Sequence, residues 1–172
     1  MPWGRKKKRE GPGVGTLGDR RAQEKRAFAS SVRSLARRPR TAAEIRTFLE
    51  RREYSSEVIE ATVQRLFEQR YLDEAAVADV IVREAERRHL GSRRVAQTMT
   101  RRGVPGEVAG EAVRESGEGD LERARALLSR RYPTGLERDP RALEKAVRLL
   151  VRRGFPYGIA RQAIGLDVDL DV

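Results

Sequence analysis

Apolar residues recur along most of this chain at the three- and four-residue spacing of an amphipathic helix, starting near residue 22. Phe28, Val32 and Leu35 follow this spacing, as do Ile59 and Val63 later in the chain. The alternation of apolar and polar residues that marks a half-buried strand is missing, and aromatic residues, which strands favour, make up only 5%. The pattern predicts nine short helices and an all-α fold.

Capping residues mark where these helices begin and end. Thr41 followed by Glu44 forms the sequence pattern of a capping box. Further N-cap candidates are Ser55 or Ser56, Asp73 and Asp120. Prolines suited to a first helical position are Pro105, Pro140 and Pro156. Glycines expected in turns are Gly91, Gly103 and Gly154, the last two as left-handed residues that close a helix.

An internal repeat of about 50 residues runs through the chain. Residues 101–105 (Arg-Arg-Gly-Val-Pro) align with 152–156 (Arg-Arg-Gly-Phe-Pro) at an offset of 51, and residues 51–55 align with 101–105 at an offset of 50. Leu49, Met99 and Leu150 then fall at one position of the repeat. The repeat predicts three tandem three-helix units, each resembling a helix-turn-helix. Because units of this size have small cores, each is expected to pack against its neighbour and to form an elongated array.

This reasoning divides the chain into five parts. The expected parts are a disordered basic tail (1–21), three-helix repeats at 22–71, 72–117 and 118–165, and an acidic C-terminal tail (166–172).

The formal charge of +11 is unevenly spread along the sequence. Residues 1–40 hold 13 Lys and Arg against three acids, whereas the remaining 132 residues hold 24 basic and 23 acidic groups. The densest run is Arg5, Lys6, Lys7, Lys8 and Arg9. Because unfolded basic runs bind phosphates without reading sequence, we expect this tail to contact single- or double-stranded DNA nonspecifically.

Composition excludes several kinds of site. The chain has no cysteine, and His89 is its only histidine, so disulfides, thiolate metal sites and a Ser-His-Asp triad built on a second histidine are excluded. The acids are interleaved with arginines along helix surfaces, which disfavours an enzyme. We expect no cofactor and no metal. No apolar run approaches the ~20 residues that span a bilayer, and no signal-peptide pattern follows the basic start. A cytoplasmic protein without membrane contact is expected.

Four ordered segments carry a resemblance to a known family. They are Arg38-Pro-Arg-Thr-Ala-Ala-Glu-Ile-Arg, Tyr71-Leu-Asp-Glu-Ala-Ala-Val-Ala, Gly91-Ser-Arg-Arg-Val before Arg101-Arg-Gly-Val, and Arg152-Arg-Gly-Phe. In order, spacing and repeat number, residues 25–165 resemble the RecX family, regulators of the bacterial recombinase RecA. The chain departs from the family at Val77, where an aromatic residue is usual, and at Glu53, where a small residue is common.

The resemblance implies a non-catalytic modulator of homologous recombination, DNA repair and the SOS response. Such a protein would bind the RecA–DNA filament, as a monomer, and inhibit RecA ATPase and strand exchange. The alternative is a helix-turn-helix protein that acts on DNA without RecA and places one helix in the major groove. The nearly balanced charge of residues 41–172 argues against that alternative.

Arginine pairs are the candidate contacts with RecA or DNA. Besides the basic tail, the candidates are Arg87, Arg88, Arg93, Arg94, Arg101, Arg102, Arg152 and Arg153. The pairs at 101/102 and 152/153 could equally serve as cations at helix C-termini, where the dipole favours them. Arg93 and Arg94 begin a helix, where the dipole disfavours cations, and are therefore the preferred contacts. His89 is expected to face solvent near a helix C-terminus.

Overall fold

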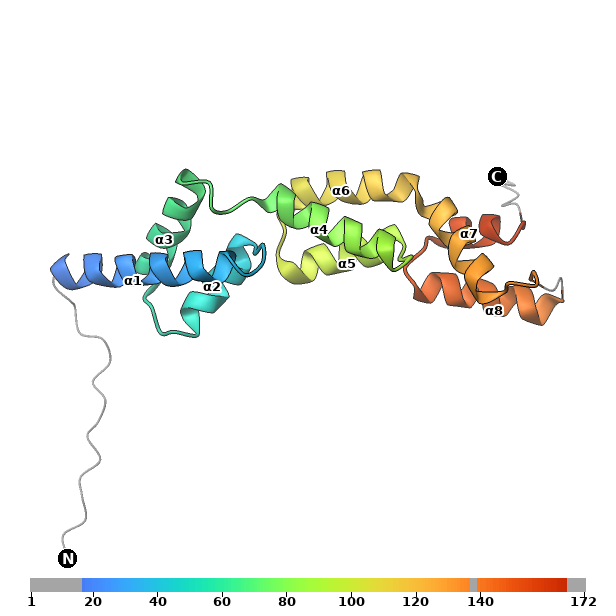
Figure 1. Cartoon of the computed structure of the whole chain (residues 1–172), viewed down its shortest axis with the longest axis horizontal. Coiled ribbons are helices and arrows are strands. Elements are labelled where there is room, and N and C mark those ends of the chain that lie inside the picture. Colours follow the sequence, from blue (N-terminus) through green and yellow to red (C-terminus); the bar gives the residue numbers. More distant parts are fainter. Residues whose placement is uncertain (1–16, 137–138, 167–172) are drawn as a thin grey trace, which may run out of the picture.

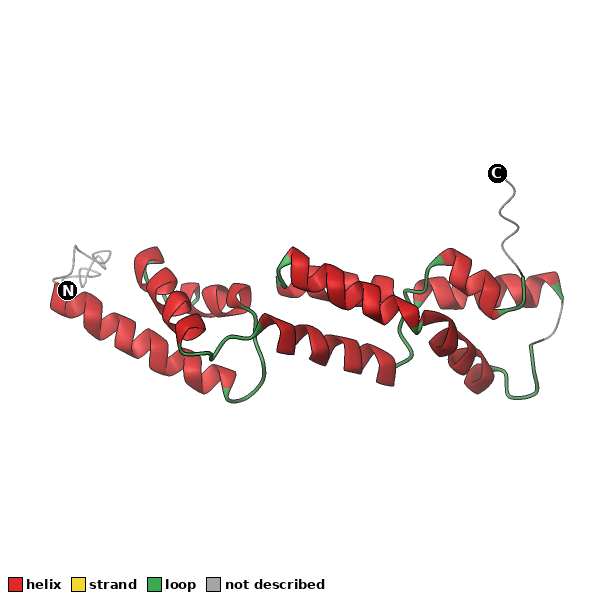
Figure 2. Cartoon of the chain, turned by 90° about the horizontal axis from the view of Figure 1, so that it is seen from above, coloured by secondary structure: helices red, strands yellow, loops and turns green. Residues whose placement is uncertain are grey.

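The computed structural model describes residues 17–136 and 139–166, and within these ranges it contains nine helices and no strand (Figures 1 and 2). The helices are α1 (Leu17–Leu35), α2 (Ala42–Glu50), α3 (Ser56–Glu68), α4 (Glu74–Arg87), α5 (Ser92–Arg102), α6 (Gly106–Glu118), α7 (Asp120–Arg131), α8 (Pro140–Arg152) and α9 (Tyr157–Ala163). The all-α prediction is confirmed.

The helices form three units, each with a separate hydrophobic core, arranged in a row (Figure 1). Unit 1 contains α1–α3, unit 2 contains α4–α6 and unit 3 contains α7–α9. Fully buried side chains at the centres of the three cores are Ile45, Leu49 and Leu66 in unit 1, Met99 in unit 2, and Leu150 and Phe155 in unit 3. The predicted elongated array of three-helix repeats is confirmed.

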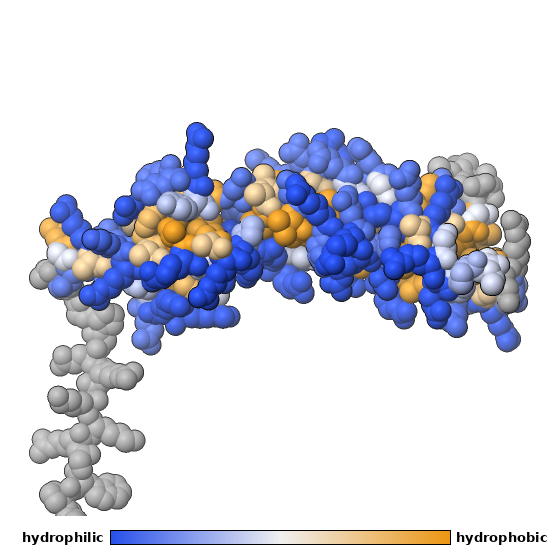
Figure 3. Space-filling model, viewed as in Figure 1, coloured by the Kyte–Doolittle hydropathy of each residue, from blue (hydrophilic) through white to orange (hydrophobic). Residues whose placement is uncertain are grey.

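Because the three cores are small, some apolar residues remain at the surface. Figure 3 shows one face of the row, where hydrophilic residues dominate and apolar residues emerge in patches over each unit. A small unit cannot enclose all of its apolar surface. Each unit therefore relies on its own narrow core and on the junctions with its neighbours.

The same helix end closes the middle helix of every unit. The backbone N–H groups of Tyr54, Val104 and Phe155 donate to the carbonyls of Leu49, Met99 and Leu150, respectively, at 3.4, 3.1 and 3.1 Å. This bond is the long-range half of a Schellman motif, which requires a left-handed residue just before the donor. The three acceptors are completely buried. The sequence offsets of 50 and 51 thus correspond to a structural repeat.

Most of the predicted caps are present. Thr41 and Glu44 form a complete capping box, and Ser55 and Asp73 each accept a hydrogen bond from the first turn of the following helix. Gly103 and Gly154 are left-handed, with φ of 70° and 93°.

Three of the predicted boundary residues occupy different positions. Asp120 is the first residue of α7 rather than its N-cap, because its carboxylate faces the neighbouring unit. Pro105 and Pro156 are themselves N-caps of α6 and α9, with φ of −55° and extended ψ, whereas Pro140 does begin α8. The fixed φ of proline suits either position.

Two helices extend across boundaries of the predicted parts of the chain. Helix α1 begins at Leu17, inside the segment 1–21 predicted as a tail, and Asp19 lies in its first turn, where an acid is favoured. Helix α6 continues to Glu118, one residue past the predicted end of the second repeat. Residues 1–16 and 167–172, which make up most of both predicted tails, lie outside the described residues.

Candidate functional site

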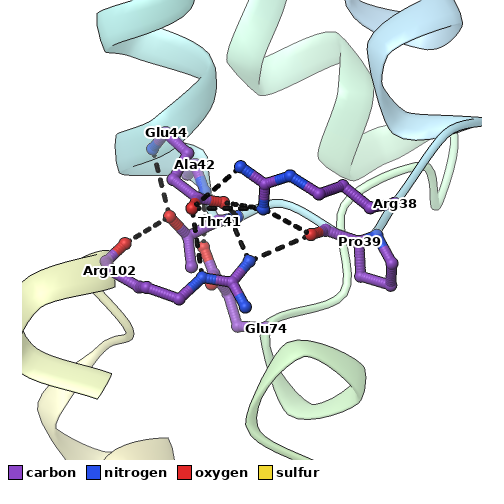
Figure 4. Close-up of polar contacts among 7 residues, drawn as sticks. All are labelled: Arg38, Pro39, Thr41, Ala42, Glu44, Glu74 and Arg102. Carbon is purple, nitrogen blue, oxygen red and sulfur yellow. Dashed lines mark hydrogen bonds and ion pairs between the residues drawn. The ribbon is translucent and has the colours of Figure 1, made fainter. Parts of the chain in front are cut away.

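The junction between units 1 and 2 joins the C-terminal end of α5 to the N-terminal end of α2 (Figure 4). The Thr41 hydroxyl donates to the backbone carbonyl of Arg102 at 2.6 Å. The Arg102 guanidinium in turn donates to both carboxylate oxygens of Glu44, at 3.1 and 2.9 Å, and to the carbonyl of Pro39. Because the Arg102 side chain is only 18% exposed, this forked pair is largely shielded from water and fixes the angle between the units.

The junction between units 2 and 3 repeats this arrangement between α8 and α5. The backbone N–H of Gly91 donates to the carbonyl of Arg153 at 3.1 Å, and that of Arg93 donates to Gly154 at 3.0 Å. A Cβ atom on Gly91 would lie 2.4 Å from backbone atoms of Gly154 and Phe155, so only glycine fits. The middle helices thus meet end to end, each negative C-terminus against a positive N-terminus.

An acid from the following unit completes each junction. Glu74, at the start of α4, accepts the Ala42 N–H of α2 at 2.8 Å. Asp120, at the start of α7, accepts the Ser92 N–H of α5 at 3.0 Å and the Ser92 hydroxyl at 2.6 Å. Helices α2 and α5 therefore each receive a cap from the first helix of the next unit, which satisfies an otherwise orphaned donor.

A groove lined with arginines crosses both junctions. At the first junction it is a hollow of about 530 Å³, and at the second a hollow of about 710 Å³. Arg101 lines both hollows, so they lie next to each other. We call this surface the arginine groove, and its charged residues are Arg38, Arg40, Arg51, Arg52, Arg88, Arg94, Arg101, Arg102, Arg153, Glu44 and Glu84.

Several guanidinium groups in the groove are held in place by backbone or ring contacts. Arg94 donates to the Arg152 carbonyl at 3.1 Å, and Arg153 donates to the Arg88 carbonyl at 3.3 Å. Arg52 lies 3.9 Å from the centre of the Phe48 ring, a cation–π contact. Neutral partners of this kind orient an arginine and leave its charge uncompensated.

Glu44 and Arg40, both at the first junction, have shifted pKa values. Burial raises the pKa of Glu44, but hydrogen bonds from Arg102 and from the Thr41 N–H outweigh it, so the net pKa is below its usual value. Burial, followed by the nearby charge of Arg38, lowers the pKa of Arg40. The Arg40 Nε is buried and has no hydrogen-bond partner among the described residues. The charge around Arg40 is therefore under-compensated.

The structure separates the predicted contact residues into two kinds. Arg102, Arg94 and Arg153 are engaged at the junctions. Arg87 and Arg88 pair with Glu84 on α4. Within the described part of the chain, the side chains of Arg93, Arg101 and Arg152 are exposed and make no hydrogen bond or ion pair. The residues of the predicted basic run, 5–9, lie outside that part.

His89, expected to face solvent, is only partly exposed. It is left-handed, with φ of 49°, and its Nε2 lies 3.1 Å from Nη1 of Arg130 on α7. The side chain therefore touches unit 3 at the second junction.

Some residues of the groove and the junctions were not identified from the sequence. Arg51 and Arg52 line the groove and align with the pairs at 101/102 and 152/153, so the repeat itself contained the signal. Arg38 and Arg40 were assigned only to a basic segment, and no local pattern shows that they face α5. Glu74 and Asp120 were missed as junction caps because their partners are 32 and 28 residues away in sequence.

The described residues offer neither a metal site nor a membrane-spanning helix. Residues 17–136 and 139–166 contain no group of three or more His, Cys, Asp or Glu side chains placed to hold a metal ion. No helix in these ranges is both long and apolar enough to cross a membrane.

Comparison with known proteins identifies the family. Residues 27–66 match the first three-helix domain of RecX, and residues 118–164 match its third. The regulatory protein RecX of Trichlorobacter lovleyi is 35% identical over 141 residues, which cover 78% of this chain and 91% of that protein. The chain belongs to the RecX family. The regulatory protein RecX of Deinococcus radiodurans is 36% identical over 147 residues, covering 84% of this chain and 70% of the relative.

Solved RecX structures share the fold. RecX from Lactobacillus salivarius superposes with a TM-score of 0.74 at 18% identity, covering 84% of this chain and 96% of that one. A second structure, described as regulatory protein RecX, gives a TM-score of 0.71 at 24% identity and covers 85% of this chain and 73% of its own. The row of three-helix units is therefore the RecX architecture.

Proposed function

We propose that this RecX-family chain is a monomeric, non-catalytic modulator of homologous recombination that binds the RecA–DNA filament in the cytoplasm and inhibits RecA ATPase and strand exchange. The support is its membership of a family whose relatives are named regulatory proteins. The chain carries out no chemistry in this proposal and requires no cofactor.

The observation that carries the proposal is the end-to-end locking of the middle helices. Two equivalent junctions hold α2, α5 and α8 in a row, so similar surfaces recur along one direction. A row with a repeated surface can contact successive subunits of a helical polymer at the same time, and linked contacts add avidity. The family, rather than the geometry, selects RecA as the polymer.

The direct test is the ATPase rate of RecA on single-stranded DNA with increasing amounts of this protein. We expect the rate and strand exchange to fall together, while the protein alone hydrolyses no ATP. An unchanged RecA rate at micromolar excess would contradict the proposal.

A variant can test the role of the row. Gly91→Ala forces a Cβ against the backbone of unit 3, so we expect weaker inhibition with helicity retained. Gly110→Ala on α6 is the matched control, because a Cβ there meets nothing within 4 Å beyond the neighbouring backbone of its own helix. Equal inhibition by the two variants would show that the row is not needed.

The alternative function, a DNA-binding protein that acts without RecA, is distinguished by three baits. Bare DNA, free RecA and the RecA–DNA filament are each immobilised and compared for capture of the chain. Our proposal requires the filament to capture the chain best, whereas equal capture by bare DNA and filament supports the alternative.

A further inference from the structure

We propose that the arginine groove binds the phosphate backbone of DNA directly, so that the folded units contact nucleic acid independently of the basic tail. This inference goes beyond the proposed function because it requires no RecA. Residues 41–172 carry nearly equal numbers of basic and acidic groups, but a sequence with balanced charge can still place its cations together on one surface.

The first argument is the charge balance within the groove. Nine arginines line it, with only two acids, Glu44 and Glu84. Both acids are already occupied, Glu44 by two arginines of the groove and Glu84 by Arg87 and Arg88. Among the described residues, Arg51 and Arg101 form no ion pair, and Arg40 has no carboxylate within ion-pair distance although it feels the charge of Glu44. The groove therefore carries a surplus of positive charge that an external anion can neutralise.

The second argument is that the groove is preorganised and incompletely satisfied. Arg94 and Arg153 are oriented by backbone carbonyls, and Arg52 by the Phe48 ring, so anion binding need not order them. The Arg40 Nε is buried without an acceptor. A buried donor left unpaired is costly, and a phosphate oxygen in the groove would supply the acceptor.

The third argument identifies the occupant as a phosphate backbone rather than bases. Phe48 is the only aromatic residue lining the groove, and its ring faces Arg52 at 3.9 Å and Arg40 at 5.7 Å. No free ring is left on which a base could stack. Gln97 is the only amide side chain in the lining, which is too little for reading base edges.

An acidic protein surface is the competing occupant, and the lining favours DNA over it. Protein interfaces are centred on an apolar core. Among the large apolar side chains of the lining, Ile81 and Val95 are buried and Val80 alone is exposed, so the groove presents nine guanidinium groups and no apolar cluster. Contacts made only by guanidinium groups match the sequence-independent phosphate contacts of nucleic-acid binding.

The test measures DNA affinity of the full chain by fluorescence anisotropy, without RecA, at several salt concentrations. To remove the tail's contribution, all variants are made in a chain whose residues 5–9 are changed to glutamine. The groove variant is Arg51→Gln, Arg88→Gln and Arg101→Gln. The control variant is Arg33→Gln, Arg114→Gln and Arg141→Gln, which removes the same charge from exposed positions outside the groove.

We expect the salt slope of the groove variant on single-stranded DNA to be lower by about 2, at ~0.7 per lost phosphate contact. The control variant should bind nearly as the parent does. Equal losses in the two variants, or no DNA binding by the parent, would overturn the proposal. So would displacement of the DNA by a polyglutamate peptide of equal charge as efficiently as by unlabelled DNA. If the triple variant does not fold by circular dichroism, Arg101→Gln alone, with an expected slope change of about 0.7, provides the same comparison.

The RecA ATPase assay on the same proteins keeps the two proposals separate. Failure of the unaltered chain to inhibit RecA would contradict the proposed function and leave the DNA result standing. If the groove and control variants lose DNA affinity equally while the unaltered chain still inhibits RecA, only DNA binding by the groove is contradicted.

Discussion

Left-handed residues close the helices of this protein, and three of them are not glycine. Glu53, Arg70 and His89 have φ of 62°, 56° and 49°. Such a conformation brings the Cβ of an L-residue close to the following carbonyl and costs about 1–2 kcal/mol. At the position of Glu53, units 2 and 3 have Gly103 and Gly154, so unit 1 carries a strain that the other units avoid.

Replacing Glu53 with glycine should therefore stabilise the protein. After subtracting the greater chain entropy of glycine in the unfolded state, we expect a gain of about 0.5–1 kcal/mol in the free energy of unfolding, measured by urea denaturation. Glu50→Gly, in the last turn of α2 with ordinary helical backbone, is the control and should lose about 1 kcal/mol. A loss in both variants would refute the strain at Glu53.

Two carboxyl groups at the first junction should give opposite dependences on pH. The pKa of Glu44 is lowered in the folded state because its hydrogen bonds outweigh burial, so its contribution is present above its unfolded pKa and is lost as pH falls through the folded value. Burial raises the pKa of Glu74, partly offset by the Ala42 N–H, so its folded state gains stability as pH falls.

Urea denaturation of Glu44→Gln and Glu74→Gln across acidic pH can measure this difference. We expect Glu44→Gln to cost about 1 kcal/mol at neutral pH, with the gap to the parent closing as pH falls below about 4. For Glu74→Gln the parent should become relatively more stable toward acid. The same trend in both variants would contradict the assignment of the two carboxylates.

At the scale of elements, the notable feature is that helix caps are exchanged between units. The N-terminus of α5 has no side-chain cap of its own, because Gly91 precedes it. Asp120 of α7 takes that role and is itself paired with Arg123 at 2.7 Å. Arg123 also donates to the carbonyls of Leu90 and Ser116. One buried carboxylate thus links two helices and a turn from neighbouring units.

Asp120→Ala should destabilise the protein by about 3 kcal/mol, because it removes the nearest carboxylate from the largely buried Arg123 charge and leaves the Ser92 N–H without its acceptor. Asp120→Asn retains an acceptor for Ser92 and should lose less. Asp139→Ala removes an ordinary, exposed N-cap of α8 and should cost about 1 kcal/mol. The urea midpoint of each variant reports these values, and equal losses at Asp120 and Asp139 would show that the junction carboxylate is only a local cap.

At the scale of the whole molecule, the basic residues of segment 1–40 do not all belong to one tail. Helix α1 begins at Leu17, and eight of the 13 basic residues in that segment belong to α1 or to the turn after it. Arg38 and Arg40 of this group line the arginine groove. The basic run at 5–9 and the groove are therefore two separate sources of attraction for DNA.

Deleting residues 2–16 should separate these sources. If all five cations at positions 5–9 contact phosphates, the salt slope for single-stranded DNA should fall by about 3–4, at ~0.7 per contact. Inhibition of RecA should persist, with slower association because electrostatic steering is reduced. Loss of inhibition with unchanged DNA affinity would contradict both roles.

Local sequence was sufficient to predict the helices, their repeat and most of their ends. Apolar spacing, the capping box at Thr41 and the Arg-Arg-Gly turns act within a few residues, so each can be read from neighbouring positions. The family resemblance rested on the same short motifs and on their order. Periodicity also placed Leu49, Met99 and Leu150 correctly in three separate cores.

Tertiary structure alone decided how the units are joined and which arginines remain available. Arg101 and Arg102 are adjacent in sequence, yet Arg102 is locked to Glu44, 58 residues away, while Arg101 lies free in the groove. Asp120 has the sequence features of an N-cap and instead caps a helix of the preceding unit. These outcomes depend on contacts between residues distant in the chain, and no local pattern specifies which face of a helix meets which neighbour.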